Sequence, residues 1–220
     1  MPLLYKEPNM DNHNPLSVAE ARVLAVLFEK SLTTPQYYPL STNALVQASN
    51  QKNARNPVMA LTEAEVGAAL NSLELRELVR RDDSSARAIK WKQRLRIVWG
   101  LDASEAGVLV ATTLRGPQTK SELKSHSDNI AGPKSMEELD RAIDILKRSS
   151  PPRLLELDRM AGQKETRFIS LVCGKEAVAE LIAAAVEAPA RVSRGANSDE
   201  LIERIAALEL RVAQLEKAVS

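Results

Sequence analysis

Four basic residues recur at alternate positions in one short segment near the middle of the chain. Mostly apolar residues alternate with them, so the segment 87–98 has a period of two, which is typical of a strand. Basic side chains on one face of such a strand lie about 6–7 Å apart, close to the spacing of phosphates along one DNA strand. The basic residues are Lys90, Lys92, Arg94 and Arg96, and the apolar ones are Ile89, Trp91, Leu95 and Ile97.

The chemistry that this strand could perform is contact with nucleic-acid phosphates. Three further arginines, Arg80, Arg81 and Arg87, lie beside it in the sequence and extend the basic patch. The alternative is a solvated outer face of an edge strand, where Lys and Arg also prevent edge-to-edge association. The sequence leaves both interpretations open.

Catalytic chemistry has little support in the sequence. The two histidines, His13 and His126, are far apart, and no pattern sets a nucleophile beside a base. The one cysteine, Cys173, ends an apolar strand pattern, where a buried small hydrophobe is expected rather than a nucleophile. The eight glycines form no phosphate-binding loop. We therefore predict a protein that is not an enzyme and uses no cofactor and no metal.

Composition and charge indicate a globular, mostly helical chain. The 220 residues are 44% hydrophobic and 27% charged, which suits one or two domains, and the 3% aromatic content favours helices over a large sheet. The net charge of +1 is unevenly distributed. Residues 15–100 have twelve Lys and Arg against eight Asp and Glu, whereas residues 101–174 have eleven of each. Any affinity for nucleic acid is therefore expected in the first of these segments.

The N-terminal segment 1–14 is polar and is predicted to be a disordered arm. Lys6, Glu7 and Pro8 stand where a signal peptide needs an apolar run. No apolar stretch approaches the roughly 18 residues of a membrane span. The sequence therefore predicts a cytoplasmic protein without a membrane partner.

The elements that would position the basic strand follow in a recognisable order. A helix begins at Ser17, where Ser17 and Glu20 can form a capping box. A short helix over 41–48 follows, and a third helix begins at Thr62 with a second box. Two strands come next, from Leu78 and over 87–98, separated by a turn. Helix, turn, helix and a two-stranded ribbon are the elements of a winged helix, which we assign to residues 15–100.

The same order recurs in residues 101–174. The segment 101–109 aligns with 16–24 at an offset of 85. Boxes at Thr119 and Ser135 open two more helices, and strands follow over 154–157 and 167–172. An internal repeat of this kind predicts a mainly α fold with small β wings (α+β), built as tandem winged-helix domains plus a C-terminal helix. The inward positions of the third helix and its copy are Val66, Ala69, Leu70 and Leu73, and Leu139, Ala142, Ile143 and Leu146.

The C-terminal part is predicted to be a helix over 175–188, a flexible linker over 189–198 and an amphipathic or coiled-coil helix over 199–220. Apolar residues in the last helix follow alternating steps of four and three, the seam of a coiled coil. Such a short helix needs a partner in water. The partner is a second copy, giving a homodimer, or the protein's own body. The seam residues are Leu201, Ile205, Leu208, Val212, Leu215 and Val219.

Two features modify the DNA-binding interpretation. The helix that would read bases begins with Glu63 and Glu65, which favour the helix dipole but repel phosphate. The turn before it, residues 50–61, is longer than usual and rich in amides. It is either a recognition loop or a self-packed loop in which Asn residues satisfy backbone groups while Val58 and Met59 fill the core. The candidate recognition residues are Asn50, Gln51, Lys52, Asn53, Arg55 and Asn56.

Several motifs make the sequence resemble a known family. They are Thr33-Thr34-Pro35-Gln36-Tyr37-Tyr38-Pro39-Leu40-Ser41, Asn50-Gln51-Lys52-Asn53, Asn56-Pro57-Val58-Met59 and Arg115-Gly116-Pro117-Gln118-Thr119. Over residues 15–173 the chain closely resembles the YceH-like family of uncharacterised bacterial proteins. The resemblance implies tandem winged-helix domains, in many members a C-terminal coiled coil, and no activity. The family usually has an acidic residue before Pro-Val-Met, where this chain has Asn56.

Two functions are compatible with these features. The first is a DNA-binding or transcription-regulator-like protein that contacts double-stranded DNA through the first wing. The second is a scaffold that uses its winged helices as adaptors for another protein without binding nucleic acid. The basic strand favours the first, and the acidic helix starts favour the second.

Overall fold

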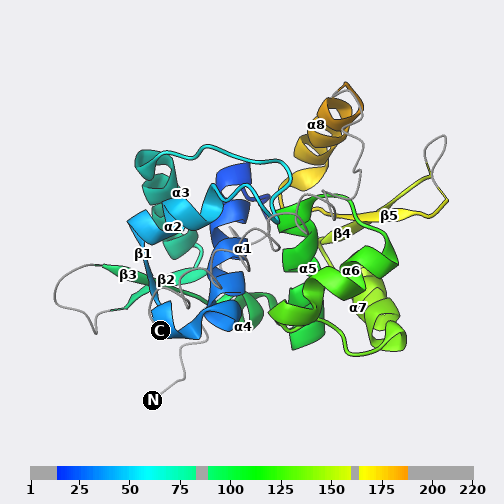
Figure 1. The fold of residues 1–220 in the computed structure, drawn as a ribbon, viewed down its shortest axis with the longest axis horizontal. Coiled ribbons are helices and arrows are strands. Elements are labelled where there is room, and N and C mark those ends of the chain that lie inside the picture. Colours follow the sequence, from blue (N-terminus) through cyan, green and yellow to red (C-terminus); the bar gives the residue numbers. More distant parts are fainter. Residues whose placement is uncertain (1–13, 83–88, 160–163, 188–220) are drawn as a thin grey trace, which may run out of the picture. The chain divides into compact units, whose positions relative to one another are not determined.

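The computed structural model describes residues 14–82, 89–159 and 164–187 of the chain. The chain divides into two compact units, Met1–Glu180 and Leu181–Ser220. The description below concerns the first unit. It is mainly helical with two small antiparallel sheets, which confirms the predicted fold class (Figure 1).

Each half of this unit contains helices followed by a strand pair. The first half consists of α1 (Val18–Thr33), the 3-10 turn η2 (Pro35–Tyr37), β1 (Leu40–Ser41), α2 (Thr42–Ser49), α3 (Glu63–Leu75), β2 (Val79–Asp82), β3 (Lys90–Gln93) and α4 (Leu95–Trp99). The second half consists of α5 (Ala103–Arg115), α6 (Lys120–Ser127), the 3-10 turn η3 (Asp128–Ile130), α7 (Met136–Arg148), β4 (Leu154–Leu157) and β5 (Arg167–Ser170).

The helices begin where the capping residues predict. The side chains of Ser17, Thr62 and Thr119 each accept from the backbone N–H three residues on. The carboxylate of the glutamate at that position accepts from the backbone N–H of the capping residue. Each such cap stabilises its helix by about 1 kcal/mol. Ser135 also caps its helix by accepting from the Glu138 N–H. The Glu138 carboxylate, however, accepts from the Ser104 hydroxyl and the Lys134 N–H instead of completing the predicted box.

The repeat seen in the sequence is also a structural repeat. Helices α2 and α6 both have 8 residues, and α3 and α7 both have 13. The first sheet has the order β1-β3-β2, with Leu40 of β1 opposite Trp91 of β3. In the second half an isolated bridge joins Gln118 to Phe168 of β5, where the first half has its β1–β3 pair. This element order is consistent with a winged-helix arrangement in each half.

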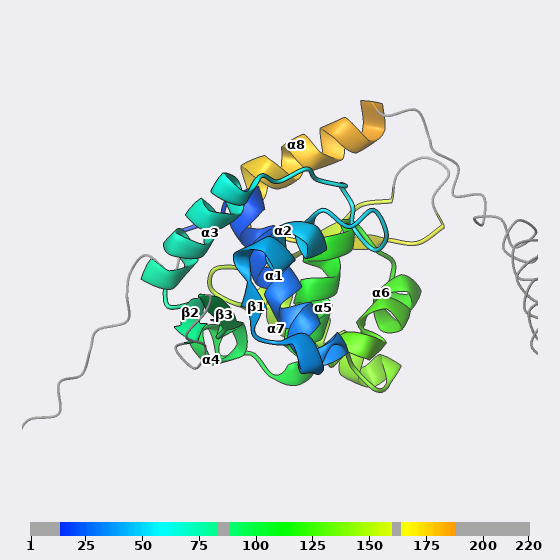
Figure 2. The same ribbon diagram turned by 60° about the vertical axis from the view of Figure 1, so that its left-hand side comes forward.

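One hydrophobic core runs through both halves. Helix α1 packs against α5 at the centre, and the two sheets lie on opposite sides of this pair (Figures 1 and 2). The eight inward positions predicted for α3 and α7 are all buried, from Val66 to Leu146. Because the core is continuous, the division into domains at residue 100 stays a prediction from the repeat.

The ends of the chain are only partly described. Helix α8 (Gly174–Glu187) agrees with the predicted helix over 175–188. The predicted linker over 189–198, the last helix and residues 1–13 of the predicted arm lie outside the described residues. Within the described ranges, none of the helices has both the length and the apolar character needed to cross a membrane.

Candidate nucleic-acid interface

The basic strand is shorter than the sequence predicts. It ends at Gln93, and the chain continues as the one-and-a-half-turn helix α4 instead of a strand to residue 98. The Gln93 side chain accepts from the Leu95 N–H at 2.9 Å, and Leu95 is buried. The prediction of a strand over 94–98 is therefore wrong. Leu95 is buried as part of a helix, but its spacing of four residues from the buried Trp91 is also the spacing of residues on one face of a strand. Ile97, predicted to face inward, is 75% exposed.

The first-sheet outer face, defined by Arg80, Asp82, Lys90 and Lys92, carries the remaining basic pattern. Directly opposed residues of an antiparallel pair share one face. Arg80 lies opposite Lys92, and Asp82 lies opposite Lys90. The other face is the inner one, since Val79 and Trp91 are both buried. Three cations and one carboxylate therefore share this outer face.

Several of the predicted cations are paired with carboxylates. Lys92 Nζ lies 3.0 Å from an Asp82 oxygen, and Arg81 lies 3.0 Å from Glu74 while its guanidinium covers the Trp91 ring at 5.2 Å. Arg94 lies 4.0 Å from Glu77. Exposed pairs of this kind are worth only about 0–1 kcal/mol, so a phosphate can compete for the cation.

Two cations of the outer face have no ion pair within the described residues. They are Arg80, which is exposed, and Lys90, which is half-buried. Arg96 is exposed on α4 and donates from Nε to the Leu101 carbonyl at 3.3 Å. Arg87 lies outside the described residues. Arg80 and Lys90 are thus the most available of the predicted phosphate contacts.

Arg94 and Arg96 also border a hollow at the end of the sheet. It has a volume of about 410 Å³ and is lined by Gln93, Arg94, Arg96, Ile97 and Leu101. The hollow is a shallow, open feature with two guanidinium groups beside one exposed aliphatic side chain. It places two further cations just beyond the end of β3.

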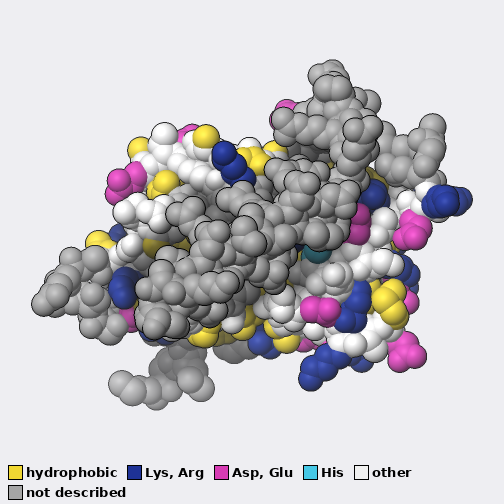
Figure 3. All heavy atoms as spheres, viewed as in Figure 1, with side chains coloured by type: hydrophobic (Ala, Val, Ile, Leu, Met, Phe, Trp, Pro, Cys, Tyr) yellow, Lys and Arg dark blue, Asp and Glu magenta, His cyan; other side chains and the backbone are white. Residues whose placement is uncertain are grey.

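The helices at the base-reading position are acidic in both halves. Glu63 and Glu65 are exposed in the first turn of α3. Hydrogen bonds from the Thr62 N–H and hydroxyl lower the pKa of Glu65, so this carboxylate is ionised near neutral pH. In α7, Glu137, Asp140 and Asp144 are exposed. Over α6 and α7, Figure 3 shows basic and acidic side chains interspersed, without a patch of one sign.

The loop before α3 is partly a self-packed structure. Asn50 Nδ2 donates to the Leu61 carbonyl and its Oδ1 accepts from the Leu61 N–H, both at 2.8 Å, which closes the loop like a backbone pair. Met59 packs against the core, as the self-packed alternative predicts, whereas Val58 is 56% exposed. Asn50 therefore serves the loop's own structure.

Arg55 was predicted to belong to the recognition loop surface, but the structure shows that it is buried. Its side chain is 0% exposed and its Nη2 lies 2.6 Å from Glu29 Oε2. The same guanidinium donates to the carbonyl of Ala48 at the end of α2 and to the Gln51 amide oxygen. An arginine with these partners holds the loop against α1 and α2 and does not present charge to a ligand. The other candidates Gln51, Lys52, Asn53 and Asn56 are all exposed.

Two residues that hold the loop were not singled out in the sequence. Arg22 is 2% exposed on α1 and donates to the carbonyls of Ser49 and Pro57 at 3.3 and 2.8 Å. Burial, followed by the charge of Arg55, lowers the pKa of Arg22 to about 10. The second is Glu29, the partner of Arg55. The sequence contains one indication of this role, because Arg22 stands among the apolar residues of the first helix, where a charged side chain needs partners.

The loop also joins the two halves of the protein. The Asn56 N–H donates to the Leu114 carbonyl of α5 at 2.8 Å. The resemblance singles out position 56, and the backbone of Asn56 makes a contact between the two halves. A charge on its side chain is not needed for this bond.

The remaining chemistry-bearing residues have structural surroundings. Cys173 packs against the core, and burial raises the pKa of its thiol to about 11. His126 Nδ1 lies 2.5 Å from Gln118 Oε1, while Gln118 Nε2 donates to the Ala111 carbonyl. Within the ranges that the structure describes, no three His, Cys, Asp or Glu side chains gather as a metal site would need.

The predicted oligomerisation seam lies outside the described residues. It comprises Leu201, Ile205, Leu208, Val212, Leu215 and Val219. Whether it pairs with a second copy stays a prediction.

Comparison with known proteins identifies the family. Residues 16–163 match the family described as "Protein of unknown function, DUF480". A UPF0502 protein of Shewanella loihica is 39% identical over 210 residues, covering 93% of this chain and 96% of the relative. One from Azoarcus sp. is 41% identical over 204 residues, covering 92% and 90%, and one from Geobacter sulfurreducens is 36% identical over 200 residues, covering 91% and 90%. The resemblance to the YceH-like proteins agrees with these matches, and the chain belongs to the DUF480, or UPF0502, family of uncharacterised bacterial proteins.

Proposed function

We propose that this protein is a non-enzymatic, cytoplasmic DNA-binding protein that contacts duplex phosphates through its first-sheet outer face. The observation that carries the proposal is the register of β2 and β3, in which Arg80, Lys90 and Lys92 share one face. Lys90 and Lys92 are two residues apart on β3, about 6–7 Å along the strand, which suits successive phosphates, and Arg80 lies beside them on β2. Arg94, the N-cap residue of α4, and Arg96 on α4 add two cations beyond the end of the strand.

The proposed contact is to the DNA backbone and not to base edges. The helices that would enter the major groove carry carboxylates in their first turns, which repel phosphate. Backbone contacts carry no direct sequence information, so affinity without strong sequence preference is expected. The winged-helix arrangement hosts many functions, and the argument therefore rests on the charged face rather than on the fold.

A salt series of binding to random duplex DNA tests this proposal. The joint substitution Arg80→Gln and Lys90→Gln removes two cations that have no ion pair among the described residues. Removal of each cation that neutralises a phosphate flattens the slope of log K against log salt by about 0.9. We expect the slope to fall by roughly 2 in the double variant. The matched control is Arg141→Gln with Arg148→Gln, which removes two exposed cations from α7 and should leave the slope unchanged. Absence of binding at low salt would refute the proposal.

A second variant tests Arg81, which lies on the other face of the same strand pair, opposite Trp91. Glu74 lies 3.0 Å from Arg81, and Glu74→Gln removes that competing carboxylate. We expect this variant to bind duplex DNA more tightly than the wild type and with a steeper salt slope. Equal affinity would mean that Arg81 makes no contact with phosphate.

The alternative function is a protein-interaction adaptor. The observation that favours it is the series of exposed carboxylates on both α3 and α7, namely Glu63, Glu65, Glu137, Asp140 and Asp144. Such a surface suits a basic protein partner. Affinity capture from a bacterial lysate, with and without nuclease, separates the two functions, because only nucleic-acid-mediated capture is abolished by nuclease treatment.

We also propose that the protein is a homodimer through its last helix. The support is the seam of apolar residues from Leu201 to Val219, whose spacing is that of a coiled coil. Deletion of residues 199–220 is expected to halve the mass measured by light scattering. An unchanged mass would mean that the seam does not join two chains.

A further inference from the structure

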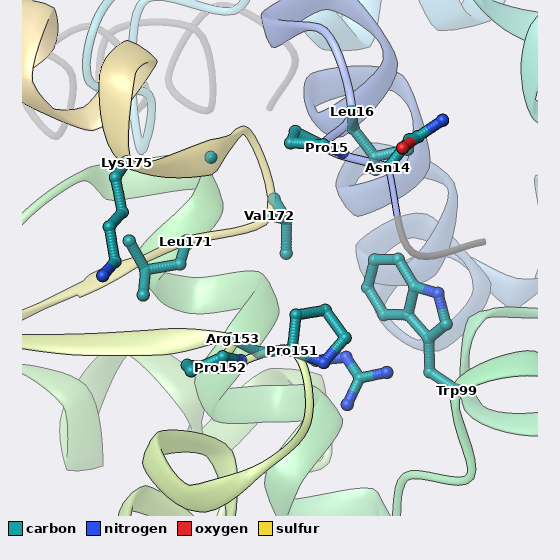
Figure 4. Close-up of a pocket in the computed structure, with 11 residues that line it drawn as sticks. Asn14, Pro15, Leu16, Trp99, Pro151, Pro152, Arg153, Leu171, Val172 and Lys175 are labelled. Carbon is teal, nitrogen blue, oxygen red and sulfur yellow. The ribbon is translucent and has the colours of Figure 1, made fainter. Parts of the chain in front are cut away.

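A pocket away from the first-sheet outer face brings together residues from both halves of the protein. Its volume is about 160 Å³, close to that of a cavity that holds one benzene ring. Figure 4 shows its walls, with Leu16 and Trp99 from the first half facing Pro151, Pro152 and the β5 end from the second. The other lining residues are Asn14, Pro15, Arg153, Leu171, Val172, Gly174 and Lys175.

The polar side chains that line this pocket are cationic or neutral. They are Arg153, Lys175 and Asn14, and none of the lining residues is acidic. The rest of the lining is mostly apolar. A site with an apolar wall and cationic donors, without carboxylates, is complementary to an organic anion.

Arg153 is the more buried of the two cationic residues that line the pocket. The side chain is half-buried, and its guanidinium lies over the Trp99 ring at 5.2 Å. No carboxylate of the described residues lies within ion-pair distance of it, and Glu105 acts on it only at longer range. Burial lowers the pKa of this guanidinium, which reflects the cost of an unpaired charge away from water.

The backbone holds Arg153 in place before any ligand binds. Its N–H donates to the Leu146 carbonyl at 3.0 Å, and its carbonyl accepts from the Leu171 N–H at 2.8 Å. The contact with the Trp99 ring restrains the guanidinium as well. An arginine held in this way can present two parallel N–H groups, a geometry that matches a carboxylate.

We propose that this pocket binds a small monocarboxylate whose apolar body is about the size of one aromatic ring. The carboxylate meets the Arg153 guanidinium, and the apolar body lies against Pro151, Leu171 and Val172. Lys175 lies on the far side of the pocket from Arg153 (Figure 4), so a single cation meets the anionic group. One cation suits a singly charged carboxylate better than a phosphate dianion. The site does not depend on DNA binding, and its test is independent of that proposal.

The experiment is an NMR titration of the full-length protein with sodium benzoate, followed through the two tryptophan indole N–H signals. Trp99 lines the pocket, whereas the buried Trp91 belongs to the first sheet and serves as an internal control. Trp91→Phe assigns the signals. We expect the Trp99 signal to shift saturably with benzoate and the Trp91 signal to stay constant. Benzyl alcohol, of similar size but uncharged, should bind at least about tenfold more weakly, since it cannot form a hydrogen bond between two charged groups.

Variants locate the anionic contact. Arg153→Gln should weaken benzoate binding at least about tenfold and leave benzyl alcohol binding unchanged. Arg148→Gln removes an arginine that is 82% exposed on α7 and should leave benzoate binding unchanged. Equal binding of benzoate and benzyl alcohol to the wild type would overturn the proposal, as would the absence of a saturable shift. The wild-type comparison decides the matter even if Arg153→Gln fails to fold.

Discussion

Replacing Arg55 with Met is expected to destabilise the protein by about 3 kcal/mol, because it leaves one partner of a buried ion pair without its counter-charge. The Arg55 side chain is fully buried, and that of Glu29 is 14% exposed. The substitution also removes the donors to the Ala48 carbonyl at the end of α2. For a chain of this size, the destabilisation corresponds to a fall of roughly 6–12 °C in the midpoint of thermal unfolding.

A double-mutant cycle separates the ion pair from the packing. Glu29→Gln alone should destabilise less than Arg55→Met, because the Gln amide oxygen can still accept from Arg55, which also keeps its bonds to the Ala48 carbonyl. The pair of substitutions together should cost less than the sum of the two, since neither then leaves an unpaired charge. Arg148→Met, at an exposed site on α7, is the matched control and should leave the midpoint nearly unchanged. Strict additivity would contradict a direct pairing of the two side chains.

Replacing Gly107 with Ala is expected to destabilise the protein by about 1–3 kcal/mol through overpacking. A Cβ at this position in α5 would lie 2.8 Å from the Ile130 carbonyl oxygen and 2.9 Å from the Gly132 backbone. Both neighbours are backbone atoms, so the segment after η3 would have to move. Urea unfolding with an unchanged slope and a lower midpoint is the expected measurement.

Gly67 provides a control of opposite sign. It lies in the interior of α3, and a Cβ there would meet nothing within 4 Å. Gly67→Ala should therefore stabilise the protein by roughly 0.5–1 kcal/mol, the usual gain in a helix interior. A stabilised Gly107→Ala protein would show that the close approach of η3 and its following segment to α5 is not maintained in solution.

The loop arginines and Gly107 are linked through the repeat. At the offset of 85, Arg22 on α1 corresponds to Gly107 on α5. In the first half, the Arg22 side chain reaches the long loop and donates to the carbonyls of Ser49 and Pro57. In the second half, the turn is shorter and its backbone packs directly on the helix, where only glycine leaves room. The connection after the second helix of each half is thus held against the first helix by an arginine side chain in one half and by direct backbone packing on a glycine in the other.

The repeat and the helix starts could be predicted because their causes are local. A capping box needs only residues three positions apart, and the buried stripe of α3 or α7 follows from helical spacing alone. The strand over 87–98 shows the limit of such reasoning. Trp91 and Leu95 are four residues apart, a spacing that fits both a strand and a strand followed by a helical turn, and the burial of Leu95 among distant residues favoured the latter.

The pairing of charges was not predictable from the sequence. Arg55 and Glu29 are 26 positions apart, and no periodicity links them. The same holds for Arg153 over Trp99, from opposite halves of the protein. The sequence shows which residues are charged, but not which of them meet a counter-charge, an aromatic ring or only solvent.

Most of the elements, the repeat and the family follow from the chain's residues read in order, because each depends on spacing or on local motifs. The availability of the cations, in contrast, arises only on folding. Folding buries Arg55, pairs Lys92 with Asp82 and leaves Arg80 and Lys90 without an ion pair among the described residues. The physical reason is that the state of a charged group depends on desolvation and on neighbours within a few ångströms, and folding brings these neighbours from distant parts of the chain.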